Sequence, residues 1–466
     1  MVQVLLLIST SFFAVALLLN AKRFMTNIKR VKGLSFMLCA AWVLMFVGLG
    51  VFFARNNMVE GVGSLDKAAS FQFLCYGLAG CIIVMYLLGH KVSSGMGFAL
   101  KALAVYCMFG IISAAYSPIP IISFYKASVL LMMVFLFAAC VSVFSRKGDG
   151  KWPLEICYFI VGLFCFGALA GALIWPEQGL QRATGSVGVL LYGTFPIMNA
   201  NELGSFGFFA FTIGLRRSFE KQKFTIKLYY ISLCLVGFTV LFLAQSRTAL
   251  IGAILGVLIM AVGIKKMRKL AFVLLIFMFM GVGYLAIKSN FDLAGGVANS
   301  ALEYAQRGQK EGGMQSFNDR VDTWFNLGLG KLADAPFLGH GFDVGVAYDI
   351  SGKHGKSHMH NSHFQILANN GILGYIPWAL FFISVCWYVF RHAKKRFLCK
   401  TDEDRYFLES AVVVLEIALR TMTGSVLVTH QWSLMIFFGI YIMFETTRRK
   451  NILAQRMAAN ESITIK

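Results

Sequence analysis

The chain has 466 residues, of which 58% are hydrophobic and 14% charged, and its mean hydropathy is +0.69. A soluble core cannot hold that much apolar surface, so these numbers exclude a soluble globular enzyme and indicate a membrane protein that crosses the bilayer many times. The net charge of +21 would suit a nucleic-acid-binding protein, but its distribution between the loops argues against that function.

Thirteen apolar runs are long enough, or nearly long enough, to cross a bilayer. The first run lacks a preceding basic segment and a small-residue cleavage site, which favours a retained helix over a cleaved signal peptide. We therefore predict an all-α polytopic membrane protein with 12–13 transmembrane helices. The runs are 2–20, 34–54, 71–89, 97–116, 125–145, 156–175, 198–215, 228–244, 249–264, 270–287, 365–390, 408–428 and 433–445.

The charges sort between alternate loops. One set of loops carries a net charge of +22, whereas the other set sums to zero. The basic set is cytoplasmic by the positive-inside rule, so the excess charge reflects membrane topology and lipid contact and gives no reason to expect a nucleic-acid partner. We expect N-terminal transmembrane helices at 1–175, a second membrane domain at 176–445 and a cytoplasmic tail at 446–466.

One long polar loop, at 288–364, lies on the non-cytoplasmic side in this topology. Its apolar residues Val321, Trp324, Phe325 and Leu332 follow a helical spacing that Pro336 ends. This pattern predicts amphipathic helices that lie along the outer surface of the membrane.

The loop ends in the segment that carries the strongest functional signal. His360 precedes a short apolar helix at 362–370, which Asn361 or Ser362 can cap and Asn370-Gly371 can end. The dipole at a helix start favours a neutral imidazole, which can accept a proton from a hydroxyl. The alternative is that His360 only caps the helix.

Two arginines are predicted to reach the same face. Arg247 stands between two apolar runs with almost no loop, and Arg320 stands at the start of the loop helix. A guanidinium group can hold a phosphate in a fixed geometry, although Arg247 could instead anchor the helix in lipid headgroups and Arg320 could form a surface ion pair. Arg182, Asn201 and Lys126 also fall near outer helix ends.

The loop also contains several histidines whose spacing fits no zinc signature, so we expect no metal site. Two arginines and one base at a membrane boundary suit a single reaction. The arginines would hold a diphosphate leaving group, and the base would activate an incoming hydroxyl. These histidines are His340, His354, His358 and His363.

The His motif resembles the signature of bacterial O-antigen ligases, in which a histidine and an asparagine, serine or arginine precede nine residues and a Gly-x-x-Gly. Here His360-Asn361 is followed after nine residues by Gly371-Ile372-Leu373-Gly374-Tyr375. Arg247 in Gln-Ser-Arg-Thr-Ala is similar to the family's outer arginine. Arg320 with the block 335–341 resembles the second arginine, and Arg182-Ala-Thr-Gly185 and Asn199-Ala-Asn201 resemble the start of the same domain, so that the likeness spans about 180–445.

The resemblance implies transfer of a glycan from undecaprenyl diphosphate to a sugar hydroxyl of lipid A–core, with inversion and without a metal or nucleotide sugar. It implies a GT-C-like helical architecture in the bacterial inner membrane, with the active site facing the periplasm. His360, Arg247 and Arg320 would be catalytic. The remaining residues expected to contact substrate are Arg182, Asn201, Lys126, Asn361 and His363.

Four alternatives stay open, one of them a zinc-dependent membrane hydrolase that would use the loop histidines. Chain polymerases for O-antigen or exopolysaccharide share the superfamily and donor chemistry but use a second lipid-linked glycan as acceptor, and some protein O-glycosyltransferases belong there too. A transporter of polyprenol-linked glycans would need deep charges, for which the sequence offers Glu416 with Arg420, and Lys101.

Overall fold

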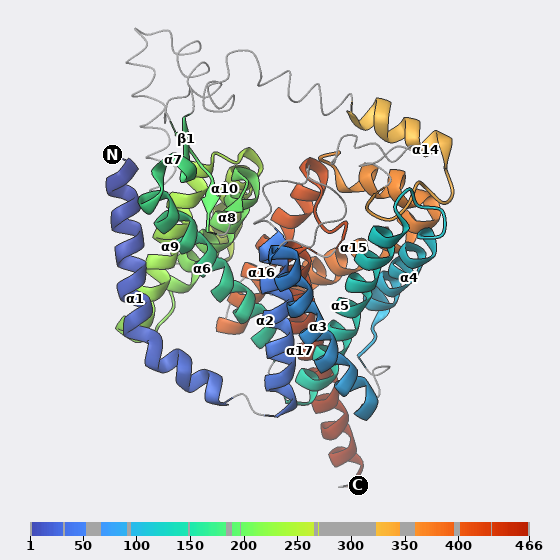
Figure 1. The fold of residues 1–466 in the computed structure, drawn as a ribbon. Coiled ribbons are helices and arrows are strands. Elements are labelled where there is room, and N and C mark those ends of the chain that lie inside the picture. Colours follow the sequence, from blue (N-terminus) through green and yellow to red (C-terminus); the bar gives the residue numbers. More distant parts are fainter. Residues whose placement is uncertain are drawn as a thin grey trace. The chain divides into compact units, whose positions relative to one another are not determined.

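The computed structural model describes residues 2–30, 33–52, 67–90, 95–147, 150–182, 189–195, 197–264, 269, 323–344, 359–395, 401–429 and 431–464. These residues are almost entirely helical (Figure 1). Twelve of the thirteen predicted apolar runs lie on α-helices, and the thirteenth, 270–287, falls outside the described residues. In the described part, six helices are long and apolar enough to cross a membrane, and three more are apolar but shorter. The prediction of an all-α polytopic membrane protein is confirmed.

The chain divides into two compact units, each assembled from segments that are far apart in the sequence. Unit 1 comprises Met1–Ile28, Tyr158–Val321 and His392–Leu419, and unit 2 comprises Lys29–Cys157, Asp322–Arg391 and Arg420–Lys466. The domain boundaries predicted at residues 175 and 445 stay predictions.

Unit 1 is built around close packing of α8 on α9. Glycines make this packing possible, because a Cβ at Gly207 would lie 2.7 Å from the backbone nitrogen of Leu241, and one at Gly237 would lie 2.2 Å from that of Phe211. The principal helices of the unit are α1 (Val2–Arg30), α6 (Trp152–Ile174), α8 (Ala200–Ser218), α9 (Phe224–Ala244), α10 (Arg247–Gly263) and α16 (Asp402–Thr423).

A buried ion cluster joins two of these helices. Arg216 and Arg217 of α8 both bond to Glu409 of α16, whose side chain is fully buried. The Arg217 Nη2 atom lies 3.0 Å from the Glu409 Oε1 atom, and the guanidinium stacks on the ring of Tyr406. Because a buried charge is costly unless it is paired, this cluster fixes α8 against α16.

The connection between α6 and α8 contains short strands that the sequence reasoning did not predict. After α7 (Pro176–Gly179), β1 (Leu180–Arg182) pairs antiparallel with β2 (Val189–Leu191), and β3 (Gly193–Thr194) pairs with β4 (Ile197–Met198). These strands are too short for an alternating pattern to reveal them.

Unit 2 is centred on α5, which packs against α2, α3, α4 and α17 and is mostly buried. Aromatic rings fill its core, where Phe137 of α5 stacks on Phe438 of α17 at 4.1 Å between ring centroids. The helices of the unit are α2 (Leu34–Phe52), α3 (Lys67–Gly89), α4 (Phe98–Ser113), α5 (Pro120–Lys147), α15 (Ser362–Lys395) and α17 (Trp432–Thr464), with a π-helical segment, η2 (Thr323–Leu329), that leads into α14 (Gly330–Asp334).

Two details of unit 2 bear on the predicted elements. The helical spacing found in the long loop corresponds to η2 and α14, which end shortly before Pro336, as predicted. The run at 408–428 was predicted to be helical throughout, but α16 ends at Thr423, and residues 424–429 are not helical. This segment instead contacts the start of α15.

Candidate active site

The candidate base stands immediately before a capped helix start. The Asn361 Oδ1 atom accepts hydrogen bonds from the backbone nitrogens of His363 at 2.9 Å and Phe364 at 3.3 Å, which is the geometry of an N-cap. His360 is exposed and has a φ of 52°, so the chain turns sharply as it enters the helix. The cap that the sequence predicts is present, and it turns the chain at His360.

The short helix at 362–370 ends at Gly371, as predicted. This glycine has φ 61° and ψ −170°, a conformation that only glycine adopts without strain, and α15 continues beyond it as a second helical part. A Cβ at Gly371 would also lie 2.3 Å from the carbonyl oxygen of Phe337. Glycine is therefore required here both by the backbone angles and by the approach of another segment.

That other segment is the turn 336–341, whose backbone bonds to both sides of the helix break. The amides of His340 and Gly341 donate to the carbonyls of Ala368 and Asn369 at 3.2 and 2.8 Å. In return, the amides of Ile372 and Leu373 donate to the carbonyls of Pro336 and Phe337 at 2.8 and 3.1 Å. Backbone groups that the break frees are thus bonded by the turn, which couples the two motif segments.

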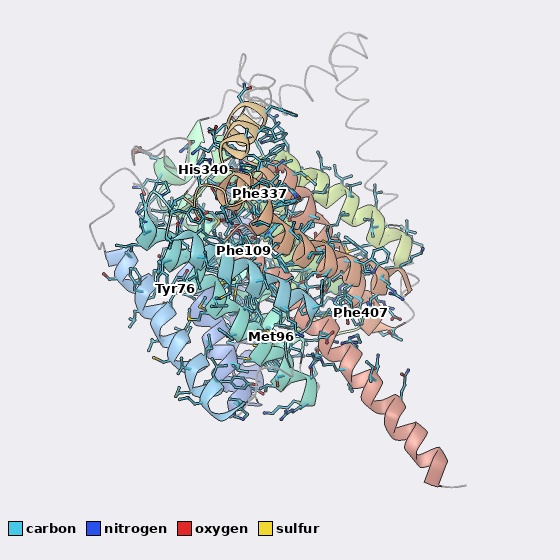
Figure 2. All side chains as sticks on the ribbon, turned by 90° about the vertical axis from the view of Figure 1, so that its right-hand side faces the viewer. Tyr76, Met96, Phe109, Phe337, His340 and Phe407 are labelled. Atoms are coloured by element: carbon cyan, nitrogen blue, oxygen red, sulfur yellow. The ribbon has the colours of Figure 1, made fainter. Side chains whose placement is uncertain are left out.

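The far end of this turn is fixed to α4 and α5. Phe342 is fully buried, its amide donates a hydrogen bond to the Ser113 hydroxyl oxygen at 2.9 Å, and its carbonyl accepts one from the Ser123 hydroxyl at 2.9 Å. The Tyr116 hydroxyl donates to the carbonyl of Leu338 at 2.7 Å, and burial raises the pKa of Tyr116, so it remains a donor. Figure 2 labels Phe337 and His340 of the turn and Phe109 of α4.

Lys126 belongs to this same attachment. Its ammonium group forms an ion pair with the carboxylate of Asp343, which has a φ of 59° just after Phe342. Lys126 was predicted to contact substrate, and that role stays a prediction, since the structure gives the side chain a partner within the protein.

The outer side of the short helix is covered by η2. The Trp324 Nε1 atom donates to the carbonyl of Met359 at 2.7 Å, directly before His360, and the Trp324 ring stacks on Phe364. Met359 and Ala368 are fully buried in the same apolar cluster. Arg320, the predicted second arginine, precedes η2 and lies outside the described residues.

The inner side of the short helix is bonded to the segment that follows α16. The Asn361 Nδ2 atom donates to the carbonyl of Met422 at 3.2 Å, and the Ser362 hydroxyl lies within hydrogen-bond distance of the carbonyls of Gly424 and Val426. The start of the helix is consequently held from three directions. We refer to residues 323–344, 359–375 and 421–428 together as the histidine block.

His363 also has partners inside the histidine block. Its Nδ1 atom lies 2.9 Å from the Tyr375 hydroxyl, and its Nε2 atom lies 3.4 Å from the hydroxyl of Thr421. The imidazole therefore joins the short helix to the residue that follows the second motif glycine. Its predicted contact with substrate stays a prediction.

Unit 1 gathers the other described candidates at one end. Gln245, with a left-handed φ of 49°, separates α9 from α10, and Arg247 is the first residue of α10 and is exposed. The Gln245 Nε2 atom donates to the carbonyl of Val189 at 2.9 Å, and Val189 is the register partner of Arg182 in the β1–β2 ladder.

The N-terminus of α8 lies at this same place. A Cβ at Gly204, in the first turn of α8, would lie 2.4 Å from the Cβ of Ser246. Asn201 is half-buried in that first turn, and Asn199 caps it by accepting a bond from the amide of Glu202 at 2.9 Å. The starts of α8 and α10, with their positive dipole ends, and the strand that carries Arg182 form what we call the arginine end.

Residues 232–379 match a family model described as O-antigen ligase. This region of the chain is similar to the O-antigen ligase family. The match includes Arg247, Arg320 and the complete motif from His360 to Gly374, whereas Lys126, Arg182 and Asn201 lie before it. No curated protein matches the chain. The match supports the resemblance to O-antigen ligases over these residues and is narrower than the span of the sequence resemblance, and the apolar helices support the multi-pass membrane architecture.

Several residues of the matched region 232–379 have structural roles that the sequence did not predict. Gly339 has a φ of 69°, and a Cβ there would lie 2.5 Å from the Asn369 carbonyl. Gly374 leaves room for the side chain of Asn370. The close spacing of glycines at 339, 341, 371 and 374 was a visible signal for tight backbone packing.

Proposed function

We propose that the protein transfers a glycan from undecaprenyl diphosphate to a sugar hydroxyl of lipid A–core, at the periplasmic face of the bacterial inner membrane. The observation that carries the proposal is the O-antigen ligase match over residues 232–379, which contains Arg247 and the whole His360 motif. The family match supports glycosyl transfer, and the ligase reaction with its donor and acceptor is our inference.

The arginine end supports the donor side of the proposal. A diphosphate needs positive charge and hydrogen-bond donors, and Arg182, Arg247 and the positive ends of α8 and α10 supply both within unit 1. Asn201 would add a neutral polar contact. Arg320 would contribute a second guanidinium from the loop. These groups would stabilise the negative charge that develops on the leaving diphosphate.

The histidine block supports the acceptor side. An exposed imidazole at the start of a helix is suited to accept a proton from a sugar hydroxyl. As His360 takes that proton, the acceptor oxygen bonds to the anomeric carbon of the donor, and the bond from that carbon to the phosphate oxygen breaks. The electron pair leaves with the diphosphate, and attack from the opposite side inverts the anomeric centre. No metal enters this scheme.

The proposed partners of the protein are an undecaprenyl diphosphate-linked glycan, lipid A–core and membrane lipid. The polymerase reaction differs only in the acceptor. A deletion strain examined by lipopolysaccharide gel separates these functions. Loss of all core-attached glycan with retained lipid-linked polymer is expected for the ligase. Single repeats attached to core would indicate a polymerase, and unchanged lipopolysaccharide would refute both.

Purified protein distinguishes the enzyme from a transporter of polyprenol-linked glycans. With defined donor and acceptor in detergent, we expect product without a sealed membrane. A protein that moves its substrate across a bilayer would form no product under these conditions. The same assay reports on each variant discussed below, provided that the variant inserts into the membrane and is purified at the parent's yield.

A further inference from the structure

The short helix at 362–370 buries a polar face. Five polar side chains, including the cap, have exposed fractions of 6% or less and fall within about half of the helix circumference at 100° per residue. An apolar face is the usual partner of a protein core, so a buried polar face in a membrane protein needs partners of its own. The five residues are Asn361, Ser362, Gln365, Asn369 and Asn370.

Direct hydrogen bonds to the protein satisfy the first two of these residues, at the start of the face. Asn361 and Ser362 bond to the segment after α16. Further along, however, the Gln365 Oε1 atom and both amide atoms of Asn370 are buried and make no hydrogen bond of good geometry within the described residues, although the Tyr106 hydroxyl interacts with the Asn370 amide. The same holds for the Ser425 hydroxyl, whose two neighbours in sequence contact Ser362.

The position of the Asn370 side chain depends on a glycine one turn later. Gly374, one turn later, leaves room for the Asn370 side chain, since a Cβ there would lie 2.4 Å from the Asn370 Cβ. The Tyr106 hydroxyl lies near the same amide and donates to the carbonyl of Val428 at 2.8 Å. Its oxygen keeps the capacity to accept a bond. The second glycine of the motif therefore permits a polar side chain at a buried position.

The chemistry of these groups selects a small neutral ligand. Asn370 supplies donors through Nδ2, and the oxygens of Asn370, Gln365, Ser425 and Tyr106 can accept. None of these groups carries a formal charge, and the nearby carboxylate of Asp343 is neutralised by Lys126. An anion or cation would have no counter-charge here, whereas a water molecule can donate and accept at once.

We propose that the buried polar face of helix 362–370 is a binding site for ordered water, held by Asn370, Gln365 and Ser425. Bound water links the helix that carries His360 to segment 424–428 beyond the first turn, where Ser362 makes direct bonds to that segment. It thereby fixes the orientation of the His360 turn. The site lies in the interior of unit 2, and its occupation by water does not depend on the identity of the donor or acceptor.

A structure of the full-length protein in lipid nanodiscs, at a resolution where waters are visible, tests the site directly. We expect density within about 2.7–3.2 Å of an Asn370 amide atom and of a second polar group of the site. Asn370 and Gln365 bonded directly to protein groups, with no density between them, would overturn the proposal.

Thermal unfolding gives an independent test through the sign of the change. Asn370→Leu and Gln365→Met keep the side-chain volume but remove the polar atoms. If water satisfies those atoms, both variants unfold at a lower temperature than the parent, because the water loses its partners. A temperature equal to or above the parent's would overturn the proposal, since it would mean that the polar atoms are unsatisfied.

Matched controls are two buried amides with direct partners. Asn20 donates to the carbonyls of Ala16 and Thr225, and Gln72 donates to the carbonyl of Gly48. Asn20→Leu and Gln72→Met should lower the unfolding temperature by a similar amount. Ser425→Ala removes only one hydroxyl, so it keeps the test usable if a larger variant does not fold. We expect it also to lower the unfolding temperature.

Discussion

The histidine block and the arginine end differ in how firmly their functional residues are held. The turn that carries His360 is fixed by a cap, by the stack of Trp324 on Phe364 and by bonds to the chain after α16. Arg247, by contrast, is exposed at the start of α10. The difference fits two kinds of chemistry. Proton transfer requires a base in one place, whereas a long cationic side chain can adjust to a diphosphate.

The substitution in the histidine block with the largest expected effect on stability and activity is Gly371→Ala. Alanine would have to adopt φ 61° and ψ −170°, with its Cβ 2.3 Å from the Phe337 carbonyl oxygen. We expect a loss of about 3 kcal/mol or more in unfolding free energy, together with loss of transfer activity. Thermal unfolding and the purified assay measure both.

The control for this variant is Gly330→Ala. Gly330 is helical, and a Cβ there would meet nothing within 4 Å. It should leave stability and activity close to those of the parent. If Gly371→Ala also unfolded at the parent's temperature, the helix break would not depend on glycine. That result would contradict the conclusion that the turn 336–341 and the break are coupled.

Removal of the base separates chemistry from folding. We expect His360→Ala to lower kcat by about 10²–10⁴-fold while leaving the KM for the donor near the parent's value. The unfolding temperature should change little, because His360 is exposed. His90→Ala, at the end of α3, serves as the control and should keep full activity. Parent-like turnover in His360→Ala would remove the imidazole from the mechanism.

These two predictions also mark how far the sequence alone could lead. The Asn361 cap and the end at Gly371 follow from local signals, since a cap and a glycine stop act within one turn of helix. The turn that bonds to the helix break lies more than 27 residues earlier in the chain. The segment after α16 that bonds to the same helix lies more than 50 residues later. No spacing within either segment encodes that pairing.

Some of the predicted site residues illustrate the same limit. Lys126 was singled out because it falls at an outer helix end, but its partner Asp343 is 217 positions away and sits in a left-handed turn. The end of α16 at Thr423 was missed because Val426, Leu427 and Val428 continue the apolar run. Composition predicted a membrane helix there, whereas the backbone groups of that stretch bond to the side chains of Ser362 and Trp378.

At the arginine end, the expected losses are smaller and concern binding. Arg247→Ala should raise the KM for the lipid-linked donor by about 10–100-fold, equivalent to about 1.4–2.8 kcal/mol of lost charge-assisted hydrogen bonding. Arg247→Lys should recover part of it, because lysine keeps the charge but not the planar fork. Arg23→Ala is the control, since it removes an exposed cation elsewhere in unit 1. Equal KM values in all three variants would contradict a diphosphate contact.

A double-mutant cycle decides what Lys126 does. If its role is the ion pair with Asp343, then Lys126→Ala and Asp343→Ala should each cost about 1 kcal/mol of stability, and the double variant should cost no more than either. If Lys126 instead contacts the donor, its replacement should raise the KM while Asp343→Ala leaves it unchanged. Unfolding curves and the KM for the donor separate the two outcomes.

The smallest expected effect belongs to Tyr116→Phe, which removes one hydroxyl at the edge of the histidine block. That hydroxyl donates to the carbonyl of Leu338. Because the tyrosine is partly exposed, water can replace it, and we expect a loss of about 0.5–1 kcal/mol with kcat and KM unchanged. If the change in kcat, expressed as an activation free energy, exceeds the change in unfolding free energy, then the turn at 336–341 moves during the reaction. The histidine block would then be less rigid than its bonds indicate.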